Sequence, residues 1–491
     1  MKKIEYKIIL LLFNLLIISS CIKDIDLYKG KTSSTTTTTT TNTYSSYIYP
    51  FNDEIKDATA EITIKSNVVI DFNQIAPEIP FLKYNKSWLL MLTQDDCKHA
   101  AYCRTWAAIN GKPISSSELF PTPPSLHELY YNAEQLEADD LPPNIIPANK
   151  TLGCTDGNGN EVRFSITTTL APEFNWMNAE TNVNRGFTDN YYRFYMKSGL
   201  TWNDVREMLN FGTGISFHDV NASDVYDPSE ILKHYRIAQD SIFGKLGRGC
   251  KMLAEPNGNK TYVTAALQYS DIQTMVAQSG TVKLYPYKVN DDLNGKLLNR
   301  TFNDDPEYFK KIIETQLLLP KAEREAIHIG VHGTDNAWIK FLQWVDNTYG
   351  KDGDDSVWFP SQEEYYEYNY YRIHSKISII QVDQYTIKLT VHLPSKTYFY
   401  YPSISINLTG LQKDNISVSS NSIVTGLSYG NYGNGITLNV DCRKSLVKHA
   451  THFVERFEKD KTNNLKKSDA TYFVNMLKES DIKKELLNRI K

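Results

Sequence analysis

The chain has 491 residues, of which 41% are hydrophobic and 22% charged, so a wholly disordered chain is excluded. At roughly 100–200 residues per domain, this length predicts more than one domain. The 53 Lys and Arg residues against 57 Asp and Glu residues give a net charge of −4, which argues against nucleic acid as a partner. The 32 Tyr residues suit either a sugar- or protein-binding surface or a Tyr-rich β core.

The first residues have the pattern of a secretory signal. Lys2, Lys3 and Lys7 precede a short apolar run, Ile8–Ile18, which is too short for an ordinary membrane span. We therefore expect residues 1–20 to be a signal peptide that is removed from the mature protein.

The residues around Cys21, I-I-S-S-C, resemble the lipobox of bacterial lipoproteins, with Ile in place of the usual Leu. The resemblance implies that Cys21 is lipidated and that the membrane is contacted through this anchor only. The following I-K-D-I-D resembles the export signals of Bacteroidetes surface lipoproteins, which implies the outer membrane and its outer face. A plain signal peptide with a chance Cys is the alternative. Residues 21–57 contain seven consecutive Thr, Thr35–Thr41, and indicate a polar tether.

Strand and helix patterns then alternate along the chain. Residues 58–86 predict a small N-terminal β segment, and the apolar run Ser87–Thr93 predicts a strand that is buried on both faces. Further strands are expected at Gly214–Phe217 and Ile327–Val331. Helices are expected to begin after three capping residues: Thr201, Asp227 and Ser361. The alternation predicts an α/β domain with a parallel sheet over 87–374, carrying a long insertion near 110–200.

The pattern changes in the last part of the chain. Alternating apolar residues in Tyr385–Leu393 predict a half-buried antiparallel strand, and 375–442 as a whole indicates a β-sandwich-like domain. Helices are expected over 443–491. If Cys21 carries lipid, five of the six Cys remain, and an odd number leaves at least one thiol outside any intramolecular disulfide.

Four short segments that follow predicted strands carry the residues suited to chemistry: T-Q-D-D-C at 93–97, G-T-G-I-S-F-H-D at 212–219, A-E-P-N-G at 254–258 and V-H-G at 331–333. In parallel α/β folds, sites are built at this end of the strands. Of the adjacent carboxylates Asp95 and Asp96, one suits a general base and the other a metal ligand, and the imidazoles of His218 and His332 suit zinc-like metals. His328 lies on the same strand face as His332, so we expect one of them in the core and the other at the mouth. An exposed acid pair, structural histidines and a plain loop are the simpler alternatives.

In order and spacing, the four segments resemble the polysaccharide deacetylase (NodB homology) family, whose corresponding motifs are T-F-D-D-G, G-H-E-I-G-N-H-T, R-P-P-Y-G and a late Leu-His. The resemblance implies a deformed (β/α) barrel and removal of N- or O-linked acetyl groups from a carbohydrate at the cell envelope. It assigns Asp95 as general base and His332 as general acid, with Asp96 and His218 as ligands of a divalent metal, zinc first and cobalt or nickel as alternatives.

This chain departs from the family pattern at four positions. Ala222 stands where the family has its second His, Gln94 replaces Phe, Cys97 replaces Gly, and Ala254 replaces Arg. These departures keep open a second hypothesis, a catalytically impaired lipoprotein of the same fold that binds glycans. A structural or adhesive surface protein is the third.

A local zinc site is a further alternative, because five candidate ligands fall within nine residues: Asp95, Asp96, Cys97, His99 and Cys103. On a helix, His99 and Cys103 would share a face, whereas Cys97 and His99 would not.

Overall fold

The computed structural model describes residues 47–54, 57–115, 145–146, 150–173, 175–178, 199–218 and 225–491. All of them fall in one of the two contact units of the chain, Tyr47–Leu119 with Glu128–Lys491. The expected signal peptide, Cys21, most of the tether, much of the insertion near 110–200 and Ala222 lie outside the described residues. Within the described ranges, no helix combines the length and the apolar character needed to cross a membrane.

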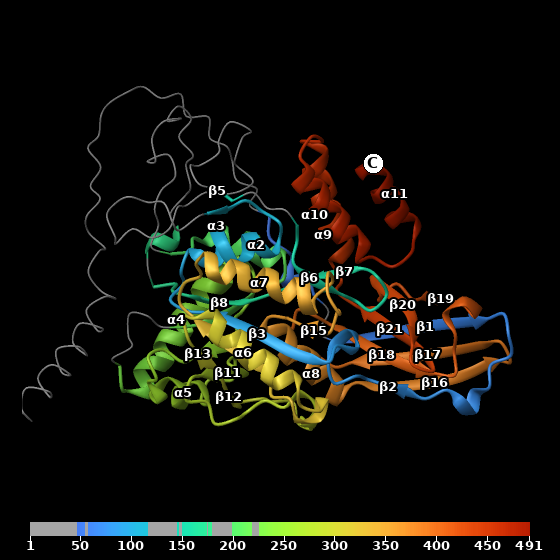
Figure 1. The fold of residues 1–491 in the computed structure, drawn as a ribbon, viewed down its shortest axis with the longest axis horizontal. Helices are drawn as coiled ribbons and strands as arrows, with labels where there is room; N and C mark the ends of the chain where they lie inside the picture. Colours follow the sequence, from blue (N-terminus) through green and yellow to red (C-terminus); the bar gives the residue numbers. More distant parts are fainter. Residues whose placement is uncertain are drawn as a thin grey trace, which may run out of the picture. The chain divides into compact units, whose positions relative to one another are not determined.

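A ring of parallel strands forms the centre of the structure (Figure 1). The strand order is β12-β11-β10-β9-β8-β3-β14-β13, and each neighbouring pair is parallel. Only Arg300 separates β12 from β13, so these two are halves of one broken strand that joins the ends of the sheet. The ring is thus a (β/α) barrel, as expected. Its strands are β3 (Trp88–Gln94), β8 (Thr167–Leu170), β9 (Gly214–Phe217), β10 (Met252–Ala254), β11 (Thr274–Ala277), β12 (Leu297–Asn299), β13 (Thr301–Phe302) and β14 (Ile327–Val331).

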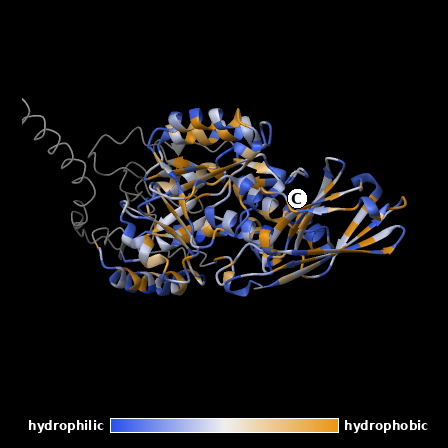
Figure 2. Ribbon diagram, turned by 90° about the horizontal axis from the view of Figure 1, so that it is seen from below, coloured by the Kyte–Doolittle hydropathy of each residue, from blue (hydrophilic) through white to orange (hydrophobic). Residues whose placement is uncertain are grey.

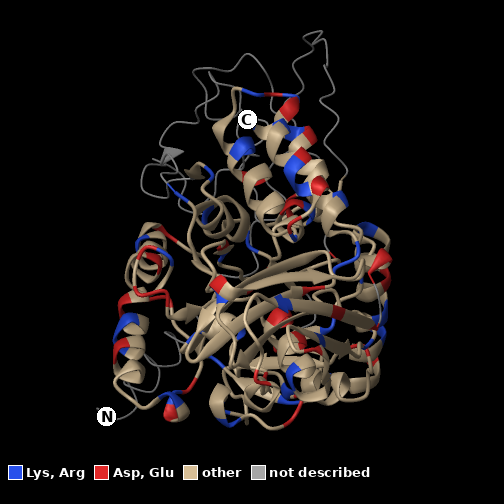
Figure 3. Cartoon of the chain, turned by 90° about the vertical axis from the view of Figure 1, so that its right-hand side faces the viewer, with Lys and Arg blue, Asp and Glu red and all other residues tan. Residues whose placement is uncertain are grey.

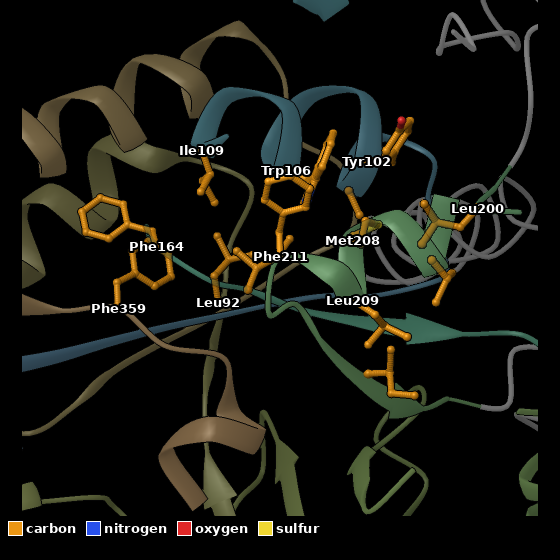
Figure 4. Packing of buried hydrophobic residues seen from close by; sticks show 14 of the residues in the cluster. Leu92, Tyr102, Trp106, Ile109, Phe164, Leu200, Met208, Leu209, Phe211 and Phe359 are labelled. Atoms are coloured by element: carbon orange, nitrogen blue, oxygen red, sulfur yellow. The ribbon is translucent and has the colours of Figure 1, made fainter. Parts of the chain in front are cut away.

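Helices cover the outside of the barrel (Figure 1). They are the π-helix η4 (Ala101–Trp106), α2 (Ala107–Ile109), α3 (Trp202–Asn210), α4 (Pro228–Leu246), α5 (Lys260–Ala266), α6 (Pro306–Leu317) and α7 (Asn336–Tyr349). The capping predictions for Thr201 and Asp227 are confirmed, because both side chains accept hydrogen bonds from the first turns of α3 and α4. Figure 4 shows Trp106 of η4 pointing toward Phe211, with ring centroids 5.2 Å apart, above Leu92 of β3. Alternate residues of β3 therefore face the helices.

The strand β8 lies in the region that the sequence analysis assigned to the insertion. Its sequence, T-T-T-L, has no apolar run, yet all four residues are buried between β9 and β3. The neighbouring strands of the insertion form short pairs instead: β4 (Ile114–Ser115) with β5 (Ile145–Ile146), and β6 (Gly153–Thr155) with β7 (Glu161–Arg163). The sequence predicts a strand around Val162–Thr168 within the insertion, and the structure divides this stretch between β7 and β8. Buried threonines resemble an exposed strand in sequence, so the place of β8 in the barrel does not follow from the sequence.

Two further sheets, each four-stranded and antiparallel, have the strand orders β16-β17-β1-β19 and β2-β18-β21-β20. Both contribute apolar residues to one buried cluster, including Ile62, Leu389, Ile406 and Leu438. Figure 2 shows hydrophobic and hydrophilic residues alternating along these strands. The segment 58–86, expected as a separate β segment, supplies one strand to each sheet. The strands are β1 (Ala58–Ser66), β2 (Pro77–Glu78), β16 (Lys376–Asp383), β17 (Thr386–Leu393), β18 (Ser403–Thr409), β19 (Ile416–Ser420), β20 (Gly426–Tyr432) and β21 (Gly435–Asp441).

The helix α8 (Gln362–His374) contacts the amino-terminal ends of the barrel strands. Its predicted cap, Ser361, accepts a hydrogen bond from Glu364 N, and its first turn contacts β8 and β9 through Gln362 and Glu363. The short strand β15 (Val357–Trp358) pairs with β3 just before it. Three helices end the chain: α9 (Leu446–Glu458), α10 (Asn464–Asn475) and α11 (Asp481–Ile490). Lys and Arg are interspersed with Asp and Glu on the helices (Figure 3), consistent with the small net charge.

Candidate active site

All four predicted segments meet at the carboxyl end of the barrel, where the fourth, A-E-P-N-G, contacts His218 through the carbonyl of Ala254. Asp95 directly follows β3, His218 directly follows β9, and His332 directly follows β14. Strands of a parallel barrel all end at the same rim, so side chains that are far apart in sequence come together there.

Asp96 lies between the two histidines. Its Oδ1 is 3.3 Å from His218 Nε2, its Oδ2 is 3.6 Å from His332 Nε2, and Lys98 Nζ is 3.9 Å away. Burial raises the pKa of Asp96, but the hydrogen bond and charge of His218, with the charges of His332 and Lys98, outweigh it and lower the pKa to about 2. Asp96 also has a φ of 61°, which is uncommon for a residue other than Gly and places the carboxylate between the imidazoles.

The His218 ring is held in one orientation by a backbone carbonyl. Its Nδ1 lies 2.9 Å from the carbonyl oxygen of Ala254, which only accepts, so Nδ1 donates and Nε2 faces Asp96. Burial lowers the pKa of His218, but the charge of Asp95 and the hydrogen bond and charge of Asp96 together raise it above the usual value. Ala254, the position that departs from the family's Arg, thus orients His218 through its backbone.

Asp95 is held by an arginine that the sequence analysis did not single out. Arg300 donates two hydrogen bonds to the Asp95 carboxylate, at 2.8 and 2.5 Å, and both side chains are buried. Arg300 comes from the break between β12 and β13, in L-N-R-T-F, where a single basic residue carries no motif. A Cβ on Gly330 of β14 would lie 2.6 Å from the Phe302 ring and 3.1 Å from Arg300, so glycine leaves the space that both side chains occupy.

The two histidines of β14 and its end have different surroundings. His328 is buried in the barrel with its Nε2 3.0 Å from Thr93 Oγ1, and burial with the charge of Arg300 lowers its pKa to about 3. The side chain of His332 is 48% exposed, and its ring packs edge-on against Phe302 with centroids 4.6 Å apart. The prediction of one core histidine and one at the mouth is therefore confirmed.

Glu255 is a second residue that the sequence analysis missed. It follows β10 in the segment expected to be a loop, is only 1% exposed, and has an Oε1 without a hydrogen-bond partner among the described residues. Burial raises its pKa. Its signals in the sequence are its place after a short apolar strand and inside the segment A-E-P-N-G, to which no carboxylate role was assigned.

The described residues supply two adjacent metal donors, Asp96 Oδ1 and His218 Nε2. Among these residues, no group of three or more His, Cys, Asp or Glu side chains is arranged to hold a metal ion. The alternative zinc site within residues 95–103 is therefore not formed, and Asp95 is engaged by Arg300. The position of the family's second histidine, Ala222, lies outside the described residues, as do Asn221 and Asp224.

Comparison with known families agrees with this geometry. A family model described as "putative polysaccharide deacetylase" matches residues 60–491, which include the barrel, both antiparallel sheets and the terminal helices. A comparison with curated protein sequences finds no match. The matched region is most of the 491 residues, and the chain belongs to the polysaccharide deacetylase family.

Proposed function

We propose that the protein removes acetyl groups from an N- or O-acetylated carbohydrate in a metal-dependent hydrolysis at the cell envelope. The observation that carries this proposal is the position of Asp96, whose two carboxylate oxygens face His218 and His332 at the rim of the barrel. Family membership supports carbohydrate deacetylation as the reaction class.

Asp95 and His332 are the proton-transfer groups. Asp95 accepts the proton of the attacking water as general base, and the two hydrogen bonds from Arg300 fix the direction of its carboxylate. His332, half exposed at the mouth, donates a proton to the leaving amine or hydroxyl as general acid.

Asp96 and His218 hold the divalent ion, with zinc as the first choice and cobalt or nickel as alternatives. His218 meets this role because its Nδ1 is already bound to the carbonyl of Ala254, which leaves Nε2 for the ion. When bound, such an ion supplies Lewis-acid polarisation of the acetyl carbonyl.

The partner in this proposal is a glycan, and nucleic acid is not a partner. The lipidated Cys21 holds the protein at the outer membrane, and the Ser/Thr-rich tether carries the catalytic body away from it. The outer face is the side that the acidic residues after Cys21 favour.

Metal content tests the proposal directly. The mature chain, with Cys21→Ser to prevent lipidation, is stripped of metal, reloaded with zinc, cobalt or nickel, and measured by mass spectrometry. About one ion per chain is expected, and the Asp96→Ala/His218→Ala variant should lose it. The matched control is Asp292→Ala/His374→Ala, which removes an Asp–His pair of similar separation, 3.2 Å, from outside the rim.

Acetate release from N-acetylglucosamine oligomers and from O-acetylated xylan then identifies the linkage. A wild-type chain that binds none of these ions contradicts the metal-dependent reaction. Glycan binding by such a metal-free chain would establish the alternative, a glycan-binding lipoprotein of the same fold.

A further inference from the structure

Gln94 is the last residue of β3 and stands where the family has an apolar Phe. It is fully buried, and its side chain contacts the loop that carries His332 rather than the apolar core. Gln94 Nε2 donates to the backbone carbonyl of His332 at 3.2 Å, and Gln94 Oε1 accepts from Thr105 Oγ1 at 3.0 Å. A carbonyl oxygen only accepts, so the amide has one orientation that satisfies both partners.

The hydrogen bonds continue from Thr105 back to the same loop. Thr105 Oγ1 lies 2.8 Å from Thr334 Oγ1, and its only proton is donated to Gln94, so Thr334 is the donor to Thr105. Arg104 Nη1 donates to the Thr334 carbonyl at 3.0 Å. The loop is thus tied at two residues, His332 and Thr334, by side chains from β3 and η4.

The element that supplies Arg104 and Thr105 is itself unusual. Residues Ala101–Trp106 form a π-helix, a rare conformation that occurs often at functional sites. Trp106 packs this helix against Phe211, at the end of α3, as Figure 4 shows. A second tie comes from Asp335, which caps α7 through the backbone amides of Ala337 and Trp338. The loop is therefore bonded at the His332 and Thr334 carbonyls and is followed directly by the capped start of α7.

We infer that Gln94 and Thr105 are positioning residues that set the place of the His332 imidazole through this closed chain of buried hydrogen bonds. Without the amide of Gln94, the carbonyl of His332 loses its donor, and the imidazole is free to move from its place against Phe302 and Asp96. The catalytic part of this inference rests on the proposed function, whereas the structural part does not.

The first test needs no substrate. The mature chain with Cys21→Ser is labelled with ¹³C,¹⁵N-histidine, and its ten histidines are followed by NMR, with His332→Ala assigning the His332 signals. Gln94→Leu, of similar volume, should shift or broaden the His332 signals and leave those of His392, on β17, unchanged. Thr105→Val should act in the same direction, and Thr105→Ser, which keeps the hydroxyl, should restore the wild-type signals.

The matched control is Gln239→Leu. Gln239, on the helix α4, is also a buried glutamine, and its amide donates to the carbonyl of Cys250 and accepts from the Cys250 amide. This variant should lose stability as Gln94→Leu does, yet leave His332 unchanged. Unaltered His332 signals in folded Gln94→Leu and Thr105→Val, or equal changes in Gln239→Leu, would overturn the inference.

The second readout is the split of the kinetic constants on whichever acetylated substrate the metal-loaded protein accepts. Gln94→Leu should lower kcat by about 10- to 100-fold with KM within about twofold, as expected for a misplaced proton donor. Unchanged kcat alongside altered His332 signals overturns the catalytic part of the inference. Absence of any deacetylation by wild type contradicts the proposed function and leaves the NMR result standing.

Discussion

The guanidinium of Arg300 binds both oxygens of Asp95 inside the barrel, at 2.8 and 2.5 Å. The two residues are 205 positions apart, and each is buried. Arg300, in the break between β12 and β13, thus supplies the buried counter-charge of Asp95.

Removing the charge of Arg300 alone should lower the free energy of unfolding more than removing the charges of both Arg300 and Asp95. Arg300→Met leaves the Asp95 carboxylate buried without a counter-charge and should lower the free energy of unfolding by about 3–5 kcal/mol. Adding Asp95→Asn should recover part of that loss, because the uncompensated charge is then gone. Urea denaturation of both single variants and the double variant measures the coupling. Additive losses would show that the pair does not act as one unit.

His332→Ala should separate proton donation from metal binding. Metal content should stay as in wild type, since Asp96 and His218 hold the ion in the proposal. The kcat on an N-acetyl substrate should fall by about 10²–10⁴-fold. The loss should be much smaller on 4-nitrophenyl acetate, whose leaving group needs no proton. Equal losses on both substrates would argue that His332 does something other than protonate the leaving group.

His328 should make the barrel sensitive to acid. Its pKa is about 3 in the folded protein against 6.5 for an ordinary histidine, so the unfolded chain binds more protons between these values. The stability that this neutral imidazole contributes is complete above pH 6.5 and is lost as the pH falls toward 3, at about 1.4 kcal/mol per pH unit. The glutamine of the His328→Gln variant does not titrate. The difference in unfolding free energy between this variant and wild type should therefore change by about 1.4 kcal/mol per pH unit between pH 6 and pH 4. A difference that is independent of pH would contradict the burial of a neutral His328.

Glu255→Gln should stabilise the protein at alkaline pH. The folded state raises the pKa of Glu255, so wild-type stability falls as the pH rises from the unfolded pKa through the folded one. The neutral amide avoids this penalty and should raise the free energy of unfolding at pH 8 by about 1 kcal/mol. The gain should shrink at pH 5, where the wild-type carboxyl is protonated to a larger extent. A gain of the same size at both pH values would point to a cause other than the charge.

The local elements were predictable because their signals are local. The apolar run before Asp95, the Thr201 capping box and the Asp227-Pro228 helix start each depend on residues within a few positions, and the structure confirms all three. The rim could also be predicted, because parallel strands of a barrel end on the same side. Residues that directly follow such strands are therefore expected to meet there, and these residues are Asp95, Asp96, His218 and His332.

The class of the fold, the strand ends that build the rim and the residue types at the rim all follow from the amino-acid sequence. The groups that support the rim residues are seen only in the folded chain: Arg300 binds Asp95, the Ala254 carbonyl binds His218, and Gln94 binds the His332 loop. The folded chain also shows that β1 joins β17, more than 300 residues away, and that the hydroxyl-rich β8 belongs to the barrel. These contacts join residues distant in the chain through single side chains or backbone carbonyls. Such contacts depend on which distant residues the fold brings together. Neither the periodicity nor the motifs of a single sequence predict them.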